Sequence, residues 1–391
     1  MKKLLLLIVI SFFALGFHYP QSRFLKSDIV YDETVSKGLV IQASTDIIKD
    51  TTQFIANDIS KIEALPIVMY DTDIGFGYGV KAFLLNQLNM KESFDLILFN
   101  STKGERWYRL VFSIPDFELR QQKEYPFSFD LIIDYDKMIK NSFFGVGSQS
   151  RLVDREYYTK EPLDISINIG RGFTSEFVGQ VGLRYKSIKN YNYDPIGRLV
   201  NMQTSLKLDN THYTSAYLNL RYDTRNSFIN PSAGFFVNGE VEFANLKILS
   251  NVKFIRWSST LQYFSNLWHS KAVIALRLVT NNILSGDLPL QILLAIGGTN
   301  TLRGSPIDRY LDKSTMLANA EFRFPLFWRL GGIVALDAGK VFLSFDKVSF
   351  NDWEVNPTFG LRLHMDTFIL RIDVGLGRET TGFYFNFGQL F

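Results

Sequence analysis

The chain has 391 residues, a formal net charge of +3, 46% hydrophobic residues and a mean hydropathy of +0.02. An α-helical membrane protein of this length would carry several apolar runs of about 20 residues, and beyond the N-terminus the sequence has none. The near-neutral charge gives no reason to expect a nucleic acid as partner. The aromatic content, 35 Phe, 18 Tyr and 5 Trp, is instead typical of strands that cross two membrane interfaces.

The N-terminus has the pattern of an export signal. Residues 1–3 supply two lysines, and the apolar run at residues 4–17 is too short to span a bilayer comfortably. Residues 14–16 read Ala-Leu-Gly, a small-x-small cleavage site, so residues 1–16 are predicted to be a cleaved signal peptide. A retained N-terminal anchor is the alternative. The chain has no cysteine, so it has neither a lipid-attachment residue nor a disulfide framework.

A short extension at residues 17–63 follows the signal. Apolar residues recur near the helical period of 3.6 across residues 45–64, which predicts a small amphipathic helix. An extension of this length is too short for one periplasmic domain of ordinary size.

From residue 65 onward the apolar period is two, the period of a β-strand. Along residues 126–137, for example, aromatic and aliphatic residues alternate with Ser128, Asp130, Asp134 and Asp136. About sixteen such segments occur, and an even number suits a bacterial barrel with both ends in the periplasm. The predicted strands are residues 65–71, 75–86, 92–101, 105–115, 126–137, 162–171, 176–188, 214–224, 234–244, 252–266, 271–284, 315–325, 332–342, 357–365, 367–376 and 381–391.

A soluble β-sandwich also alternates apolar and polar residues, so alternation alone does not decide the fold. The deciding combination is an export signal, many alternating segments, aromatic-rich apolar faces and charged opposite faces. This is the pattern of a barrel with lipid outside and water inside.

The end of the chain carries a pattern of its own. Thr380, Gly382, Phe385 and Phe387 fit a polar-x-Gly-x-x-aromatic-x-aromatic sequence, and the strand ends on Phe391. This pattern resembles the assembly signal of outer-membrane barrels, the alternative being a merely aromatic strand. A barrel needs its last strand to pair with its first, so this strand is expected to form the closing seam.

Four further motifs occur in the second half of the chain, in a turn, a long loop and the two strands after that loop. The turn carries Asp223, Arg225, Pro231 and Gly234, the loop Gly297, Gly298, Arg303 and Gly304, the first strand Glu321 and Arg323, and the second Asp337 and Gly339.

In this order and with these spacings, the motifs resemble the barrel domain of the bacterial surface antigen superfamily, which includes BamA, TamA and the two-partner secretion transporters. The resemblance covers residues 64–391. It implies an all-β, 16-stranded antiparallel transmembrane β-barrel of the outer membrane, with a long sixth extracellular loop folded into the lumen. The sequence departs from the family in two places: Ser305 replaces an aromatic residue after Arg-Gly, and residues 17–63 cannot hold the periplasmic POTRA repeats.

The residues of the loop and the two strands predict an internal contact. Asp337 lies on the same strand face as Gly339, opposite the apolar face, and Glu321 and Arg323 share the polar face of their strand. An arginine on a loop inside a wide lumen can make a bidentate contact to a carboxylate on the inner wall. We therefore expect Arg303 to pair with Asp337, with Glu321 and Arg323 nearby and the loop glycines permitting the tight backbone.

Signs of catalysis are weak. The four histidines are scattered, so neither a metal-ligand spacing nor a nucleophilic triad can be assembled, and no cofactor or metal is expected. A membrane lipid hydrolase using His364 with Ser344, or His269 with Ser265, is an alternative with nothing in its favour. The protein is expected not to be an enzyme.

The resemblance implies participation in inserting or translocating protein or lipid at the outer membrane. The implied route is a seam between the last strand and the first, which is predicted to be short and contains Pro66. The expected partners are outer-membrane lipid, the assembly machinery that inserts the barrel, a separate periplasmic partner and a client protein or lipid. A passive or gated pore plugged by the Arg303 loop, and a structural surface-antigen barrel, are the alternatives.

Overall fold

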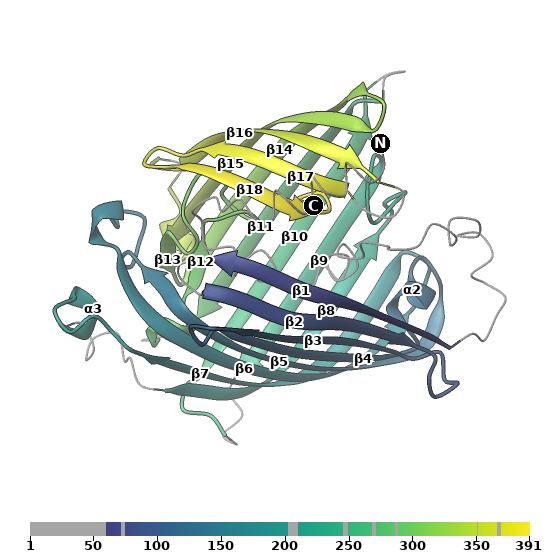
Figure 1. The fold of residues 1–391 in the computed structure, drawn as a ribbon, viewed down its shortest axis with the longest axis horizontal. Coiled ribbons are helices and arrows are strands. Elements are labelled where there is room, and N and C mark those ends of the chain that lie inside the picture. The colour runs from purple at the N-terminus through teal and green to yellow at the C-terminus, as the bar shows by residue number, and fades with distance from the viewer. Residues whose placement is uncertain are drawn as a thin grey trace.

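The computed structural model describes residues 60–71, 75–201, 210–244, 249–267, 271–285, 288–349, 351–365 and 369–391. Sixteen strands form one antiparallel sheet in chain order, which Figure 1 shows curled into a barrel wall, and a two-stranded hairpin stands apart from it. The strands of the sheet are β1 (Lys61–Asp71), β2 (Gly75–Leu85), β3 (Ser93–Ser101), β4 (Arg106–Ile114), β5 (Tyr125–Phe143), β6 (Glu156–Gly172), β7 (Phe177–Tyr191), β8 (Thr211–Asp223), β9 (Gly234–Ala244), β10 (Phe254–Asn266), β11 (Val273–Leu284), β14 (Ser314–Phe327), β15 (Leu330–Phe342), β16 (Glu354–His364), β17 (Ile369–Leu376) and β18 (Thr381–Phe387). The hairpin is β12 (Leu294–Ile296) and β13 (Tyr310–Asp312), and the short helices are α2 (Phe117–Arg120), α3 (Arg198–Asn201), η3 (Leu152–Asp154), η4 (Leu290–Ile292) and η5 (Phe345–Lys347).

Each of the sixteen predicted strands corresponds to one strand of the sheet, so the predicted barrel fold is confirmed. The differences lie at the strand ends. β1 begins at Lys61 and has 11 residues, so it is not short, and it pairs with β2 along its whole length. The helix predicted over residues 45–64 is therefore wrong for residues 61–64, and residues 45–59 lie outside the described part of the chain.

The side chains of the strands show an inside-out pattern of burial. On β7, Val181 and Leu183 are 55% and 57% exposed, whereas the neighbouring Arg184 is 8% exposed. Ionisable residues are rarely buried in soluble domains unless they are paired. The apolar face of this sheet is therefore suited to lipid, and the polar face lines the lumen.

The two ends of the barrel differ. One end carries the first residue of β1, the last residue of β18 and short connections such as residues 173–176 and 328–329; we call it the turn end. The opposite end, which we call the loop end, carries the longer connections. These are the third loop (residues 144–155), the fourth (192–210), the sixth (285–313) and the seventh (343–353).

The sheet has two edge strands, β1 and β18, and no backbone ladder joins them in the described residues. Figure 1 shows these edges as the purple and yellow ends of the colour series. β18 has only seven residues and ends at Phe387, so the prediction of a strand through Phe391 is wrong. Gly388 adopts a positive φ of +81°, and the residues after it leave the sheet.

The last four residues, which we call the C-terminal tail (residues 388–391), turn into the lumen. Leu390 and Phe391 are buried with Phe264 of β10 and Ala275 of β11. The guanidinium groups of Arg277 and Arg323 each lie 5.2 Å from the centre of the Phe391 ring. Cations stacked on an aromatic face are attracted by its quadrupole, which gives this aromatic residue a favourable place in a polar interior.

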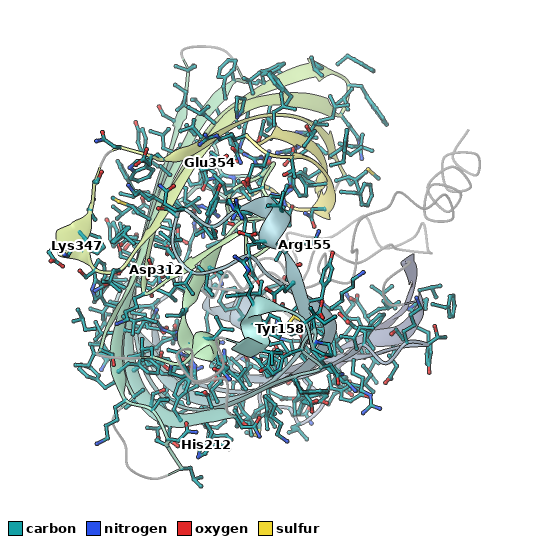
Figure 2. All side chains as sticks on the ribbon, turned by 90° about the vertical axis from the view of Figure 1, so that its left-hand side faces the viewer. Arg155, Tyr158, His212, Asp312, Lys347 and Glu354 are labelled. Atoms are coloured by element: carbon teal, nitrogen blue, oxygen red, sulfur yellow. The ribbon has the colours of Figure 1, made fainter. Side chains whose placement is uncertain are left out.

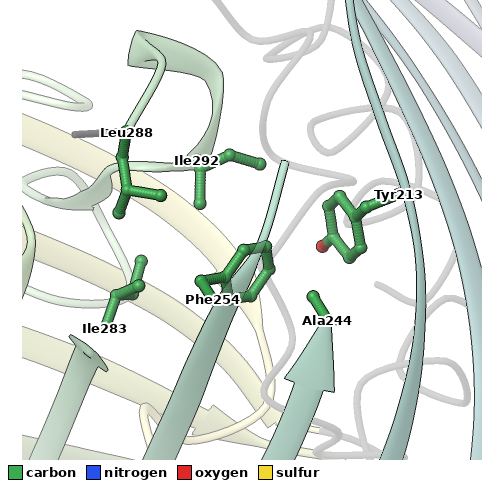
Figure 3. Packing of buried hydrophobic residues seen from close by; sticks show 6 residues of the cluster. All are labelled: Tyr213, Ala244, Phe254, Ile283, Leu288 and Ile292. Atoms are coloured by element: carbon green, nitrogen blue, oxygen red, sulfur yellow. The ribbon is translucent and has the colours of Figure 1, made fainter. Parts of the chain in front are cut away.

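The sixth loop also folds inward from the loop end. Its base packs on the ends of β8 to β11 through an apolar cluster, shown in Figure 3, in which Leu288 and Ile292 meet Ile283, Phe254 and Tyr213. Farther along, β12 and β13 place Ile296 and Tyr310 against Leu317 and Val341 of the barrel wall, and Leu302 belongs to the same buried cluster. These apolar contacts position the tip of the loop over the inner faces of β14 to β17.

Candidate functional site

At the tip of the sixth loop, Arg303 lies inside the barrel in contact with three carboxylates. Its Nε and Nη2 donate to the two oxygens of Asp337 at 2.7 and 2.9 Å. Its Nη1 donates to Glu321 Oε1 at 2.8 Å and to Asp373 Oδ2 at 2.9 Å. All four side chains are 0% exposed. We call these four residues the Arg303 lock.

The lock joins the loop to three strands, because Glu321 lies on β14, Asp337 on β15 and Asp373 on β17. The structure thus brings together the predicted Arg303, Asp337 and Glu321. Burial by itself would lower the pKa of Arg303, which lies on the loop rather than on a spanning strand, but Asp337 and Glu321 outweigh burial and hold it well above its usual value. Arg303 is therefore a fixed cation, and its bidentate contact sets the orientation of the loop.

The glycines of the loop permit this path. Gly297, Gly298 and Gly304 have φ values of +134°, +89° and +94°, the region that favours glycine. A Cβ on Gly304 would lie 2.5 Å from the backbone nitrogen of Gly377, so the loop touches the connection between β17 and β18. Gly339 of β15 makes room for the loop, since a Cβ there would lie 2.9 Å from Ile296.

Beside the lock, the loop is tied to the last strand by Tyr384 of β18. The Gly304 N–H donates to Tyr384 Oη at 2.8 Å, and the Thr380 hydroxyl donates to the Gly304 carbonyl. Ser305, at the position where the resemblance implies an aromatic residue, is buried and accepts a hydrogen bond from Asn356 at 3.0 Å. Tyr384 of β18 lies beside it, since its hydroxyl donates to the Ser305 carbonyl at 3.4 Å.

Below the lock, further buried arginines surround the same carboxylates. Arg323 donates to Glu321 at 2.9 Å and to the Phe391 carbonyl at 2.8 Å. Arg362 donates to Asp373 at 2.6 Å. The tail is thereby connected to the lock through Arg323 and Glu321, although it lies nearer the turn end.

Sequence reasoning missed Asp373, Arg362 and Tyr384. Asp373 lies on the polar face of an alternating strand, which is a signal for the lumen but not for a particular partner. Tyr384 lies between the aromatic residues of the terminal pattern. Since every strand of a barrel presents such a face, periodicity alone does not select these residues.

The predicted turn after β8 forms a second arginine–carboxylate pair. Arg225 Nε and Nη2 donate to the two oxygens of Asp223 at 3.0 and 2.8 Å, and the Arg225 carbonyl accepts from Gln122 at 2.6 Å. Gly234 has φ +111°, and a Cβ there would overlap the Thr224 carbonyl. Pro231 lies at the turn end in the same connection, so the motif fixes a turn and is not part of the lock.

The residues of the predicted assembly signal have different surroundings. Gly382 is buried beneath the Tyr384 ring, and a side chain there would overlap its hydroxyl. Phe385 lies on the outward face, Phe391 is inside the lumen, and the side chain of Phe387 lies outside the described part. Gly382 thus leaves the space through which Tyr384 reaches the loop.

Of the two alternative catalytic pairs, the structure describes both members of only one, and it keeps those two apart. Ser344 follows the loop end of β15 and His364 closes β16 at the turn end, so the neighbouring strands hold them at opposite ends. His269 lies outside the described residues. Within the ranges that the structure describes, no group of three or more His, Asp or Glu residues is placed to hold a metal ion. No helix among those ranges is long and apolar enough to cross a membrane.

Comparison with known proteins supports this architecture. Residues 95–391 match the Omp85 superfamily domain. No curated protein matches the chain. The solved structure of BamA from Haemophilus ducreyi lacking POTRA domains 1–3 is similar with a TM-score of 0.60 and 15% identity, covering 84% of this chain and 69% of that one.

Two CdiB structures are similar as well. CdiB from Acinetobacter baumannii has a TM-score of 0.56 and 14% identity, covering 84% of this chain and 59% of that chain. CdiB from Escherichia coli has a TM-score of 0.57 and 12% identity, covering 81% and 58%. At these identities the likeness shows the fold, and this chain spans less than two thirds of either CdiB chain.

Proposed function

The chain belongs to the Omp85 superfamily, and from that premise we propose that it inserts or translocates protein or lipid at the bacterial outer membrane through a seam between β1 and β18. The observation that carries the proposal is that these two strands are the edges of the sheet, with no ladder between them in the described residues. An unpaired strand edge inside a bilayer offers backbone donors and acceptors to another strand. A client strand, or a lipid, would enter sideways at this place.

The last strand is held from inside, which supports an opening on the side of β1. β18 is connected to the sixth loop through Tyr384, and its neighbour β17 through Asp373 of the lock. The tail after β18 is fixed in the lumen by Arg323 and Arg362, the latter donating to Gln389 at 2.9 Å. β1, in contrast, is paired with β2 alone among the described strands. The seam would thus open by movement of β1 while β18 stays in place.

The cellular setting is part of the same proposal. Residues 1–16 would direct export, the turn end would face the periplasm and the loop end the exterior. The outer-membrane assembly machinery would insert the barrel, and a separate periplasmic protein would deliver clients.

A gated pore is the second candidate, because the lumen is lined by polar side chains and the sixth loop lies within it.

Two assays on the purified full chain in phospholipid vesicles separate the candidates. An unfolded β-barrel client is followed by heat-modifiable migration, and a fluorescent phospholipid by its movement between leaflets. The proposal expects faster client folding or lipid movement than in empty vesicles. Ready ion conductance in a planar bilayer with neither activity would favour the pore.

A further inference from the structure

A second arginine of the sixth loop, Arg309, makes a set of contacts at the loop end that is separate from the Arg303 lock. Its Nε and Nη2 donate to Glu379 Oε2 at 2.8 and 2.7 Å. Its Nη1 and Nη2 donate to the hydroxyl and the carbonyl of Ser150 at 2.8 and 2.6 Å. Arg309 is 1% exposed although it lies among loops. We call Arg309, Ser150 and Glu379 the Arg309 clasp.

Two aromatic rings and two backbone contacts reinforce the clasp. The Arg309 guanidinium lies 4.4 Å from the centre of the Tyr310 ring and 5.2 Å from that of Phe144. The Gly147 N–H donates to the Leu311 carbonyl at 2.8 Å, and the Leu152 N–H donates to Glu379 at 3.3 Å. Charge-assisted hydrogen bonds are roughly twice as strong as neutral ones, and stacking on aromatic faces adds to them.

The clasp joins loops that the sequence separates widely. Ser150 belongs to the third loop between β5 and β6, Arg309 to the sixth loop and Glu379 to the short connection between β17 and β18. Figure 2 views this end of the barrel and shows the ribbon that carries Arg155 and Tyr158 lying over the interior. The third loop is thus a flap across the mouth, fastened on its far side to the C-terminal strands.

The two sides of the flap are held differently. Toward the fourth loop, Phe143 and Tyr158 pack with Leu199 and Leu290 in an apolar cluster. Beside the clasp there is instead a polar cavity of about 380 Å³, lined by residues that include Lys340, Trp353 and Arg378 as well as the clasp residues. On that side, the hydrogen bonds of Arg309 and its stacking on Phe144 and Tyr310 hold the third loop to the C-terminal strands.

We propose that the Arg309 clasp is a gate at the loop end, which closes the lumen to that side and opens when Arg309 releases Ser150 and Glu379. The gate lies at the mouth of the lumen, away from the seam, so it goes beyond the proposed function. The proposal of a gate does not depend on whether clients enter at the seam. Ion flow through the lumen measures the opening of the gate independently of client insertion.

The absence of native cysteines allows a direct test in the full-length protein. The double variant Ser150→Cys/Glu379→Cys removes the carboxylate and the hydroxyl that accept from Arg309, leaving only the backbone carbonyl of residue 150, and its two thiols can be joined with a cleavable bifunctional thiol crosslinker. In planar bilayers, we expect the uncrosslinked variant to be open, the crosslinked variant to be closed as in the wild type, and cleavage to reopen it. Conductance that is the same in all three states would overturn the gate.

A single substitution tests the gate independently of the crosslinking experiment. Arg309→Gln keeps a polar side chain but loses the charge-assisted bonds, so the open probability should rise roughly tenfold or more. Arg151→Gln is the matched control, because Arg151 pairs with Asp154 on the same loop with its side chain 71% exposed, and it should leave the open probability unchanged. Heat-modifiable migration verifies that each variant forms the barrel. Equal conductance of the Arg309→Gln variant and the wild-type protein would contradict the proposal.

Discussion

The guanidinium of Arg303 donates hydrogen bonds to three buried carboxylates. A lysine could not make the same set of bonds, because its ammonium lacks the planar fork of donors. Arg303→Met would leave Asp337, Glu321 and Asp373 without this partner. We expect the free energy of unfolding to fall by about 3–5 kcal/mol, the usual effect of breaking a buried ion pair. Urea unfolding of the barrel in detergent measures the change.

Arg303→Lys is the informative companion variant, because it keeps the charge and removes the bidentate geometry. It should unfold between the Met variant and the wild type, with the sixth loop more open to protease. If both variants unfolded at the wild-type urea concentration, the lock would not contribute to stability.

The Tyr384 hydroxyl is expected to connect the loop to the last strand. Tyr384→Phe retains the ring over Gly382 and leaves the Gly304 N–H without its partner, at a cost of about 1–3 kcal/mol for a buried donor. Tyr222→Phe, on the 45% exposed outward side chain of β8, is the control and should be close to neutral. Equal urea midpoints for the two variants would show that the hydroxyl does not hold the loop.

Whether a contact between two residues could be predicted from the sequence depended on how distinctive each of the two positions is. Arg303 could be matched with Asp337 because a loop arginine between glycines is unusual and Asp337 has a clear strand face. Asp373 could not be selected, since it is one of many inward polar residues. β17, the strand that carries Asp373, is brought to the lock only by the curvature of the barrel.

At the level of elements, the period of two predicted every strand of the sheet, because each strand meets lipid on one face and water on the other. The residues at which the strands begin and end are set by tertiary contacts instead of by the alternating pattern. β5 continues to Phe143 and β6 begins at Glu156, beyond the predicted segments, since their loop end forms the flap that meets the sixth loop. Phe391 fits the alternation of β18, yet Gly388 and the stacked cations of the lumen redirect it inward.

The C-terminal tail is predicted to restrain β18. Phe391→Ala removes the ring between Arg277 and Arg323 and its contacts with Phe264, so the tail should detach and the short β18 should fray. Hydrogen exchange of the amides in residues 381–387 should become faster, while exchange in β9 stays unchanged. Unaltered exchange in β18 would mean that the tail lies in the lumen without restraining the strand.

In the whole molecule, three sets of contacts act on the C-terminal side of the barrel. The clasp lies at the loop end, the lock in the middle of the barrel and the tail near the turn end. All three sets of contacts involve β14 to β18 or their connections. β1 lies at the opposite edge of the sheet. These contacts hold the C-terminal side of the barrel, whereas β1 pairs with β2 alone among the described strands, as the proposed opening at β1 requires.

The most direct measurement joins the two edges covalently. A cysteine replaces the outward-facing Phe385 of β18, and a second one replaces Ile62, Ala64 or Pro66 on the outward face of β1 near the same end. Because the chain has no other cysteine, oxidation reports only this pair. We predict that the oxidised barrel stops accelerating client folding or lipid movement and that reduction restores the activity. Full activity of a completely crosslinked barrel would contradict the account.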